Sequence, residues 1–96
     1  MPIFVRLVSF TSEGHKAMKS FREKRAEYLA SLKKLNIKLI SEYVTTGKYD
    51  MVTVLDAPDL NSVLKLSALA GLTGRTRSET MSAVTAADFE KLMESV

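Results

Sequence analysis

The fold is decided by one stretch of sequence, IKLISEYVTTGKYDMVTVL (residues 37–55). Its first part, 37–46, places apolar side chains in both alternating phases, a pattern typical of a β-strand. Gly47 and Lys48 supply a tight turn, because glycine adopts positive φ without a steric penalty. A second strand-like run follows over 49–55. The stretch therefore predicts a β-hairpin in the middle of the chain.

A strand and a helix are predicted before this hairpin. Residues 3–10 are apolar apart from Arg6 and Ser9, and they predict a buried strand. Apolar side chains then recur every three or four residues, which predicts a single long amphipathic helix over 14–35. Asn36 is expected to end that helix in the left-handed conformation.

A second helix, a fourth strand and a short final helix are predicted after the hairpin. Proline is favoured at early helical positions, so Ala-Pro-Asp at 57–59 is expected to open a helix that runs to about Leu72. Residues 75–84 predict a strand, and Thr85 begins a capping sequence for the final helix. The order βαββαβ followed by α predicts a ferredoxin-like α+β fold, with a four-stranded antiparallel sheet and both main helices on one face. We expect residues 1–96 to form one domain of this kind.

Both faces of the predicted sheet are apolar. Strand 3–10 places Ile3 and Val5 in one phase and Phe4 and Val8 in the other. A sheet with one face in water should instead alternate apolar with polar side chains. Because the chain has too few elements to cover the second face, we expect a homodimer in which two sheets face each other. The second predicted helix is also apolar on nearly every side, and it is a candidate contact for a higher homo-oligomer.

Composition and charge exclude several classes of function. The 96 residues include no cysteine and one histidine, so we expect no metal site. No apolar run is long enough for a membrane span, and the first residues do not resemble a secretory signal. Basic residues concentrate between His15 and Asn36 without a nucleic-acid-binding motif, and we interpret them as a solvated helix face. We therefore expect a cytoplasmic protein without a membrane or nucleic-acid partner.

The hairpin turn also carries a family resemblance. Gly47-Lys48-Tyr49-Asp50, followed by Ala57-Pro58-Asp59, resembles the GYD domain family, which is named after its Gly-Tyr-Asp motif. Phe-Thr-Ser-Glu-Gly at 10–14, Lys-Arg-Ala at 24–26 and Arg-Ser-Glu-Thr at 77–80 are similar to that family as well, so the similarity covers essentially the whole chain. The resemblance implies a dimeric α/β barrel, in which two ferredoxin-like sheets pack face to face. It implies no particular reaction, because the family is largely uncharacterised.

Charged residues at apolar positions are candidates for a ligand site. Arg25 lies on the apolar stripe of the first predicted helix, where it either extends outward or pairs with a carboxylate, from Asp50 or from a ligand. Arg6 and Glu79 lie in strands that are neighbours in a ferredoxin-like sheet, so they are expected to pair across it. Such a pair is either a core ion pair or the polar end of a ligand pocket.

The turn residues Tyr49 and Asp50 have two interpretations. In a structural role, the ring packs at the end of the sheet and the carboxylate accepts backbone hydrogen bonds. In a functional role, they place a phenol donor beside a carboxylate at the mouth of a pocket. His15 lacks an assigned partner and is interpreted as a polar first-turn residue in water. With Tyr43 on the second strand, the ligand-binding candidates are Arg6, Arg25, Tyr43, Tyr49, Asp50 and Glu79.

These residues favour a homodimer that binds a small organic molecule between its sheet and helices. Anionic molecules belong to the expected ligands. Two alternatives stay open. A cofactor-independent enzyme would use Asp50 or Glu79 as a base, with Tyr49 or Arg25 stabilising developing negative charge. A structural or assembly protein would have no pocket and would use the second helix as its contact. No phosphate-binding loop, nucleophile triad or dinucleotide motif is present, so the sequence assigns no cofactor.

Overall fold

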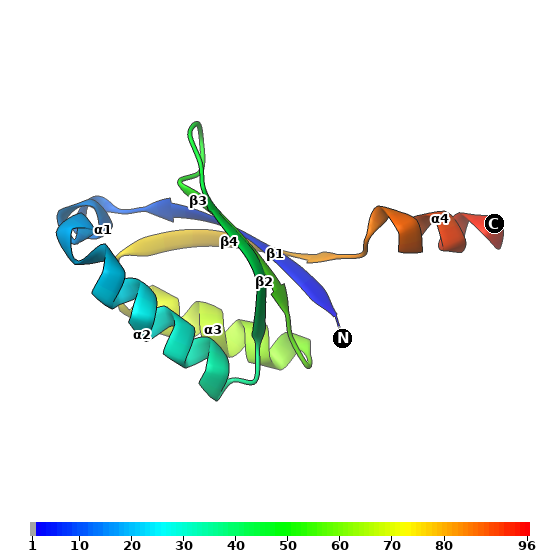
Figure 1. Ribbon diagram of the computed structural model, residues 1–96, viewed down its shortest axis with the longest axis horizontal. Coiled ribbons are helices and arrows are strands. Elements are labelled where there is room, and N and C mark those ends of the chain that lie inside the picture. Colours follow the sequence, from blue (N-terminus) through cyan, green and yellow to red (C-terminus); the bar gives the residue numbers. More distant parts are fainter. Residues whose placement is uncertain (1) are drawn as a thin grey trace.

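The computed structural model describes residues 2–96 and contains a four-stranded antiparallel sheet with two long helices on one face (Figure 1). The strand order is β2-β3-β1-β4, which is the ferredoxin-like α+β arrangement that the sequence predicts. In the part of the chain that the structure describes, no helix is both long enough and apolar enough to cross a membrane. The elements in chain order are β1 (Ile3–Phe10), α1 (Ser12–Lys16), the 3-10 helix η1 (Met18–Ser20), α2 (Phe21–Lys34), β2 (Lys38–Val44), β3 (Met51–Asp56), α3 (Leu60–Leu72), β4 (Thr76–Ala83) and α4 (Ala86–Glu94).

The register of the strands divides their side chains between a helix-covered face and an open face. Phe4 is opposite Leu55, and both are buried against α2 and α3. Val5 is opposite Val54 and Met81 and therefore lies on the other face of the sheet. Figure 1 shows α2 and α3 together on one side of the sheet. The core on that side consists of Phe4, Leu32, Ile37, Leu55, Ala57, Val63 and Leu66.

The first helical region is broken, so the prediction of one continuous helix over 14–35 is wrong. α1 ends at Lys16, and η1 separates it from α2. Thr11 ties the start of α1 to the loop before β4, since its N–H donates to the Arg75 carbonyl at 3.0 Å and its hydroxyl donates to the Gly74 carbonyl at 2.6 Å. The chain must then change direction before α2 can cross the sheet. Apolar periodicity does not report this tertiary contact, because the spacing continues through the break.

The backbone has positive φ at the two turns where the sequence predicts it. Asn36 has φ of 59° and ends α2, as the sequence predicts for a left-handed cap. Gly47 has φ of 100° and forms the turn of the central hairpin. This turn therefore depends on glycine for its conformation.

Side-chain caps define where α3 and α4 begin. The Asp59 carboxylate accepts hydrogen bonds from both the N–H and the hydroxyl of Ser62, each at 2.8 Å, so Asp59 is the N-cap of α3. Pro58 precedes this cap, and its predicted position inside the helix is wrong. The Thr85 hydroxyl accepts a hydrogen bond from the Asp88 N–H at 3.0 Å and caps α4 as predicted.

Candidate functional site

A cavity of about 300 Å³ lies between α2, α3 and the helix-covered face of the sheet. Its walls are mainly apolar: Val8 and Met51 come from the sheet, Phe21 from α2, and Leu66 and Leu69 from α3. Polar side chains line the rest of the cavity, and several of them are charged. A cavity of this size that combines apolar walls with converging polar groups is typical of a small-molecule site.

Arg6 is the charged group that the sheet places in this cavity. It comes from the middle of β1 and is 2% exposed. Its Nη1 donates to the Tyr28 hydroxyl at 3.1 Å, and its Nη2 donates to Ser78 Oγ at 2.9 Å. The guanidinium carbon also lies 5.9 Å from the centroid of the Tyr28 ring, within the range of a cation–π contact. These contacts hold the guanidinium in place without bringing a negative charge to it.

The guanidinium of Arg6 has no carboxylate partner. Among residues 2–96, no Asp or Glu oxygen lies within 4.0 Å of it. Its Nε is buried without a hydrogen-bond partner, and so is Oγ1 of Thr53, the residue directly opposite Arg6 on β3. Thr53 is also 2% exposed and lines the same cavity. Buried polar groups normally have partners, so two adjacent groups without one are the unusual feature of this cavity.

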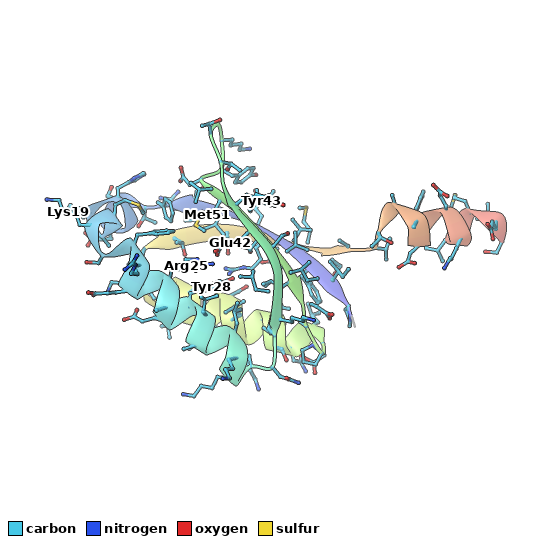
Figure 2. All side chains as sticks on the ribbon, viewed as in Figure 1. Lys19, Arg25, Tyr28, Glu42, Tyr43 and Met51 are labelled. Carbon is cyan, nitrogen blue, oxygen red and sulfur yellow. The ribbon has the colours of Figure 1, made fainter. Side chains whose placement is uncertain are left out.

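The register extends this polar region across the sheet. Thr53 is opposite Arg6 on one side and Glu42 on the other, so the three residues form one row on the helix-covered face. Glu42 forms an ion pair with Arg25 of α2, in which Arg25 Nε lies 2.6 Å from Glu42 Oε1. The Glu42 side chain is only 10% exposed. In Figure 2, Arg25 and Tyr28 lie between α2 and the sheet, on the side where Glu42 lies. Glu42 is a site residue that the sequence analysis missed, although it occupies a strand phase shared with Ile40 and Val44.

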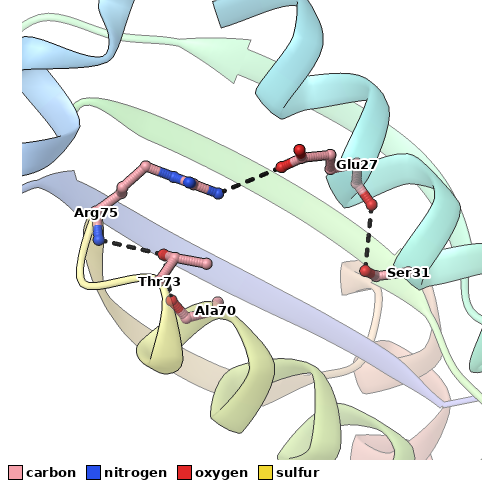
Figure 3. Close-up of polar contacts among 5 residues, drawn as sticks. All are labelled: Glu27, Ser31, Ala70, Thr73 and Arg75. Carbon is pink, nitrogen blue, oxygen red and sulfur yellow. Dashed lines mark hydrogen bonds and ion pairs between the residues drawn. The ribbon is translucent and has the colours of Figure 1, made fainter.

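A second ion pair lies at the rim of the cavity between α2 and the loop before β4. Arg75 Nη2 lies 3.6 Å from Glu27 Oε2 (Figure 3). The Arg75 N–H donates to Thr73 Oγ1 at 3.2 Å, and the Thr73 hydroxyl donates to the Ala70 carbonyl at 2.7 Å. These hydrogen bonds fix the loop to the end of α3. The ion pair therefore connects both helices at this end of the cavity.

The charges that line the cavity favour an anion. Four cationic side chains and two carboxylates contribute, which gives a formal net charge of +2. Both carboxylates are already paired with arginines. In the described residues 2–96, no three His, Cys, Asp or Glu side chains are grouped so that they could hold a metal ion. The charged lining residues are Arg6, Lys24, Arg25, Glu27, Glu42 and Arg75.

The predicted pairing of Arg6 with Glu79 is wrong. Arg6 is opposite Thr80 in β4, whereas Glu79 is opposite Leu7. Successive residues of a strand point to opposite faces, so this difference of one residue puts Arg6 under the helices and Glu79 on the open face. Glu79 is exposed there. The sequence gives the neighbouring strands correctly but does not determine their register.

Arg25 pairs with Glu42 and not with Asp50, which the sequence analysis gave as one of the alternatives for Arg25. Asp50 Oδ2 accepts a hydrogen bond from the Phe10 N–H at 2.8 Å, and the Asp50 N–H donates to the Val8 carbonyl at 2.8 Å. These bonds fasten the hairpin turn to the end of β1. This is the structural interpretation of Asp50 that the sequence left open.

The two candidate tyrosines lie outside the cavity. Tyr49 is beside Lys48, whose Nζ lies 5.5 Å from the centroid of its ring. Tyr43 is exposed and opposite Val52, on the open face of the sheet. His15 is exposed on α1, in agreement with its interpretation as a polar first-turn residue. Of the six candidates, Arg6 and Arg25 line the cavity, and Tyr43, Tyr49, Asp50 and Glu79 do not.

Comparisons with known proteins agree with this fold and identify the family. The crystal structure of FFRP-DM1 is 17% identical, with a TM-score of 0.60 over 88% of this chain and 100% of that one. The hypothetical protein PHS023 from Pyrococcus horikoshii is 16% identical, with a TM-score of 0.55 over 88% of this chain and 92% of that one. At these identities the likeness is one of fold alone.

Comparisons of the sequence identify the family to which the chain belongs. The glutamine synthetase and cystathionine beta-lyase binding protein of Thermus thermophilus is 26% identical over 90 residues, which cover 93% of this chain and 95% of that protein. The sequence model of the GYD domain matches residues 4–93. The chain therefore belongs to the GYD domain family.

Proposed function

We propose that this protein binds a small organic anion in the cavity between its sheet and helices α2 and α3, and that it does so as a homodimer. The observation that carries the proposal is the burial of Arg6, which is 2% exposed and has no carboxylate partner in the described part of the chain. Removing an ionised group from water costs several kcal/mol unless an opposite charge and hydrogen bonds compensate for it. A bound anion would supply that charge.

The hydrogen bonds of Arg6 compensate for only part of this cost. Tyr28 and Ser78 accept from the two terminal nitrogens, while Nε and the neighbouring Thr53 hydroxyl are left without partners. A carboxylate has two acceptor oxygens that suit the planar, forked donors of a guanidinium. Both atoms are covered in the ligand-free protein, so neighbouring side chains would have to move aside for one oxygen to reach Arg6 Nε and the other to reach Thr53. This chemistry favours a carboxylate as the anionic group.

The remaining walls of the cavity define the rest of the ligand. Phe21, Leu66, Leu69 and Met51 surround the space next to the charged residues. Apolar surface of this kind gains about 25 cal/mol for each Å² that it removes from water. A cavity of about 300 Å³ is at the small end of the range for ligand sites. The expected ligand is therefore a small carboxylic acid with an apolar body.

The open face of the sheet supports the dimer. Val5, Leu7, Val52 and Val54 lie on this face, opposite the helices. If a second copy packed its own open face against this one, these four side chains of both copies would be buried between the two sheets. This is the arrangement of the dimeric α/β barrel that the family resemblance implies. The absence of cysteine supports a cytoplasmic location for a single domain of this kind.

Protein binding is a second candidate function, because the Thermus thermophilus relative is named as a binding protein for two enzymes. In this chain, the outer side of α3 is the surface that favours it, since Leu60, Leu64 and Leu72 are exposed there. An enzymatic function has less support. The two carboxylates expected to act as a base, Asp50 and Glu79, do not line the cavity.

Thermal melting with matched acids and amides tests the proposal. Benzoate and hexanoate should raise the melting temperature of the wild-type protein, whereas benzamide and hexanamide should not, because they have the same size without the charge. A ligand at one hundred times its dissociation constant stabilises a protein by about 2.7 kcal/mol. Arg6→Met should abolish the response to the acids.

Arg22→Met is the matched control, because Arg22 is an exposed arginine of α2 that does not line the cavity. This variant should retain the full response. Equal stabilisation of the wild-type protein by acids and amides would argue against an anion site. An unchanged response in Arg6→Met would place the anion elsewhere.

A further inference from the structure

Lys24 is the lysine that the fold withdraws partly from water. Within residues 2–96, Lys24 on α2 is half-buried, whereas every other lysine is exposed. It also lines the cavity between the sheet and the helices. Lysine usually keeps its ammonium group in water, and where it is buried it is normally paired with a negative charge. A negative partner for Lys24 has to come from the chain or from the ligand.

The chain supplies partners for only some of the cations in the cavity. Arg25 and Arg75 each form an ion pair with a carboxylate of α2 or β2. For Arg6 and Lys24, no Asp or Glu oxygen among residues 2–96 lies within 4.0 Å of a charged side-chain nitrogen. The formal net charge of +2 in the cavity therefore belongs to these two residues. Unpaired cations in a cleft with apolar walls concentrate a positive potential there and attract anions.

The helix brings Lys24 to the cavity one turn away from the contact between α2 and Arg6. Tyr28 makes that contact, since its hydroxyl accepts from Arg6 Nη1 at 3.1 Å. Lys24 precedes Tyr28 by four residues, and residues with this spacing lie on the same side of a helix, about 6 Å apart along its axis. Both line the cavity. A ligand bound at Arg6 therefore has a second cation within reach along the wall that α2 provides.

We infer that the ligand of this cavity carries two carboxylates, one bound by Arg6 and the other by Lys24. The inference rests on the proposed function and narrows its ligand from a carboxylic acid to a dicarboxylic acid with an apolar chain. Both carboxylates are ionised at neutral pH, so together they would balance the net charge of +2. The apolar side chains of Phe21 and Leu69, which line the same cavity, would contact the chain between the two carboxylates.

The two cations have different properties and would have different roles. Arg6 is held by hydrogen bonds to Tyr28 and Ser78, and its planar group suits a carboxylate in a fixed orientation. Lys24 is a compact charge on a flexible stem, so it adjusts to the position of the second carboxylate. Glutarate and adipate, which differ by one methylene group, should therefore both bind.

Isothermal titration calorimetry with adipate, its monoamide and hexanoate tests the inference at neutral pH. The monoamide has an uncharged amide of the same size in place of the second carboxylate, and hexanoate has a methyl group there. The wild-type protein should bind adipate at least about tenfold more tightly than the monoamide, the equivalent of about 1.4 kcal/mol. Lys24→Met should bind adipate and the monoamide equally and should keep most of its affinity for hexanoate.

Lys34→Met is the matched control. Lys34 is an exposed lysine of the same helix and does not line the cavity. This variant loses the same charge as Lys24→Met, so it accounts for the general effect of net charge on the binding of anions. It should keep the full preference for adipate over the monoamide.

The outcomes separate this inference from the proposed function. Equal binding of adipate and the monoamide by the wild type, with no binding by Arg6→Met, would overturn the second carboxylate and leave the site at Arg6 standing. A preference for adipate that persisted in Lys24→Met would overturn the role of Lys24. Equal weakening of hexanoate and adipate in Lys24→Met would overturn it as well, because both cations would then hold a single carboxylate. A wild type that bound none of the three ligands would overturn the proposed function together with this inference.

Discussion

Arg6 combines a permanent positive charge with almost complete burial. Tyr28 holds it from α2 through both a hydrogen bond and its ring face, and Ser78 holds it from β4. Within residues 2–96, no Asp or Glu oxygen lies within 4.0 Å of its guanidinium nitrogens. In the absence of a ligand, Arg6 is therefore expected to lower the stability of the protein.

Replacing Arg6 should reveal this cost. Arg6→Met has a similar volume without the charge, and we expect the free energy of unfolding to stay the same or to rise by about 1–4 kcal/mol. Urea denaturation of the ligand-free protein measures it. Tyr28→Phe supplies the reference, because removing the hydroxyl that accepts from Arg6 should cost about 1–3 kcal/mol in the wild type and less in Arg6→Met. A loss of about 3 kcal/mol or more in Arg6→Met would mean that the charge is already compensated.

Part of this site could be predicted from the sequence. Arg6 and Arg25 were identifiable because each is a charge within an apolar pattern. The carboxylate that lies on their face of the sheet was not identifiable, since Glu42 and Glu79 are equally plausible until the register is known. The register puts Glu42 on the helix-covered face and Glu79 on the open one. A one-residue shift would reverse such assignments, and hydrophobic pattern alone does not fix the shift when both faces are apolar.

At the scale of elements, the start of α1 depends on close contact with the loop before β4. Gly14 is buried, and a Cβ at this position would lie 2.1 Å from the Arg75 carbonyl oxygen. A backbone atom cannot move aside as a flexible side chain can. Gly14→Ala should therefore destabilise the protein by about 1–3 kcal/mol, as overpacking usually does. Chemical denaturation measures this loss.

Gly71 is the matched control for that substitution. It lies within α3, where an added Cβ would meet nothing within 4 Å. Gly71→Ala should raise stability by about 0.5–1 kcal/mol, because alanine loses less backbone entropy in a helix than glycine does. If Gly14→Ala behaved like Gly71→Ala, the close contact between α1 and the Arg75 loop would be contradicted.

The N-terminus of α3 should make stability depend on pH. The backbone hydrogen bond from Ser62, followed by the bond from its hydroxyl, lowers the pKa of Asp59 below its usual 3.8. A lowered pKa in the folded state means that the ionised cap stabilises the protein above pH 3.8 and that this contribution disappears as the pH falls. Asp59→Asn keeps an acceptor without the charge. It should therefore be less stable than the wild type at neutral pH, and the difference should narrow on acidification.

Urea denaturation from about pH 7 to about pH 3 measures this difference. Asp88→Asn in α4 is a suitable control, since its side chain lies in the first turn of a helix capped by Thr85 instead. If the difference in free energy of unfolding between the wild type and Asp59→Asn widened toward acid pH, the role of the ionised cap would be contradicted.

The elements themselves were largely predictable, and the exceptions have tertiary causes. β1 and the hairpin around Gly47 follow directly from alternation and turn chemistry. The break between α1 and α2 does not, because Thr11 bonds to a loop that is distant in the sequence. Pattern also predicts α4 as a helix, but no pattern within one chain states which surface it covers.

At the scale of the whole molecule, the open face and the helix-covered face should respond differently to the same substitution. Val52 lies on the open face, so Val52→Lys should yield a folded monomer by placing a charge in the proposed dimer interface. Val8 lines the cavity beneath the helices and is buried, so Val8→Lys should unfold the chain instead. Sedimentation and circular dichroism distinguish these outcomes. A Val52→Lys protein that remains a dimer at micromolar concentration would contradict the face-to-face arrangement.

The most direct test of the anion site is native mass spectrometry of the protein purified from its source organism, beside Arg6→Met produced in the same cells. The account predicts that the wild type retains a small organic acid, at one molecule per chain, which denaturation releases as an anion. It predicts that Arg6→Met is empty. Equal occupancy of both proteins by the same molecule would contradict the account, because the buried guanidinium would then not be what holds it.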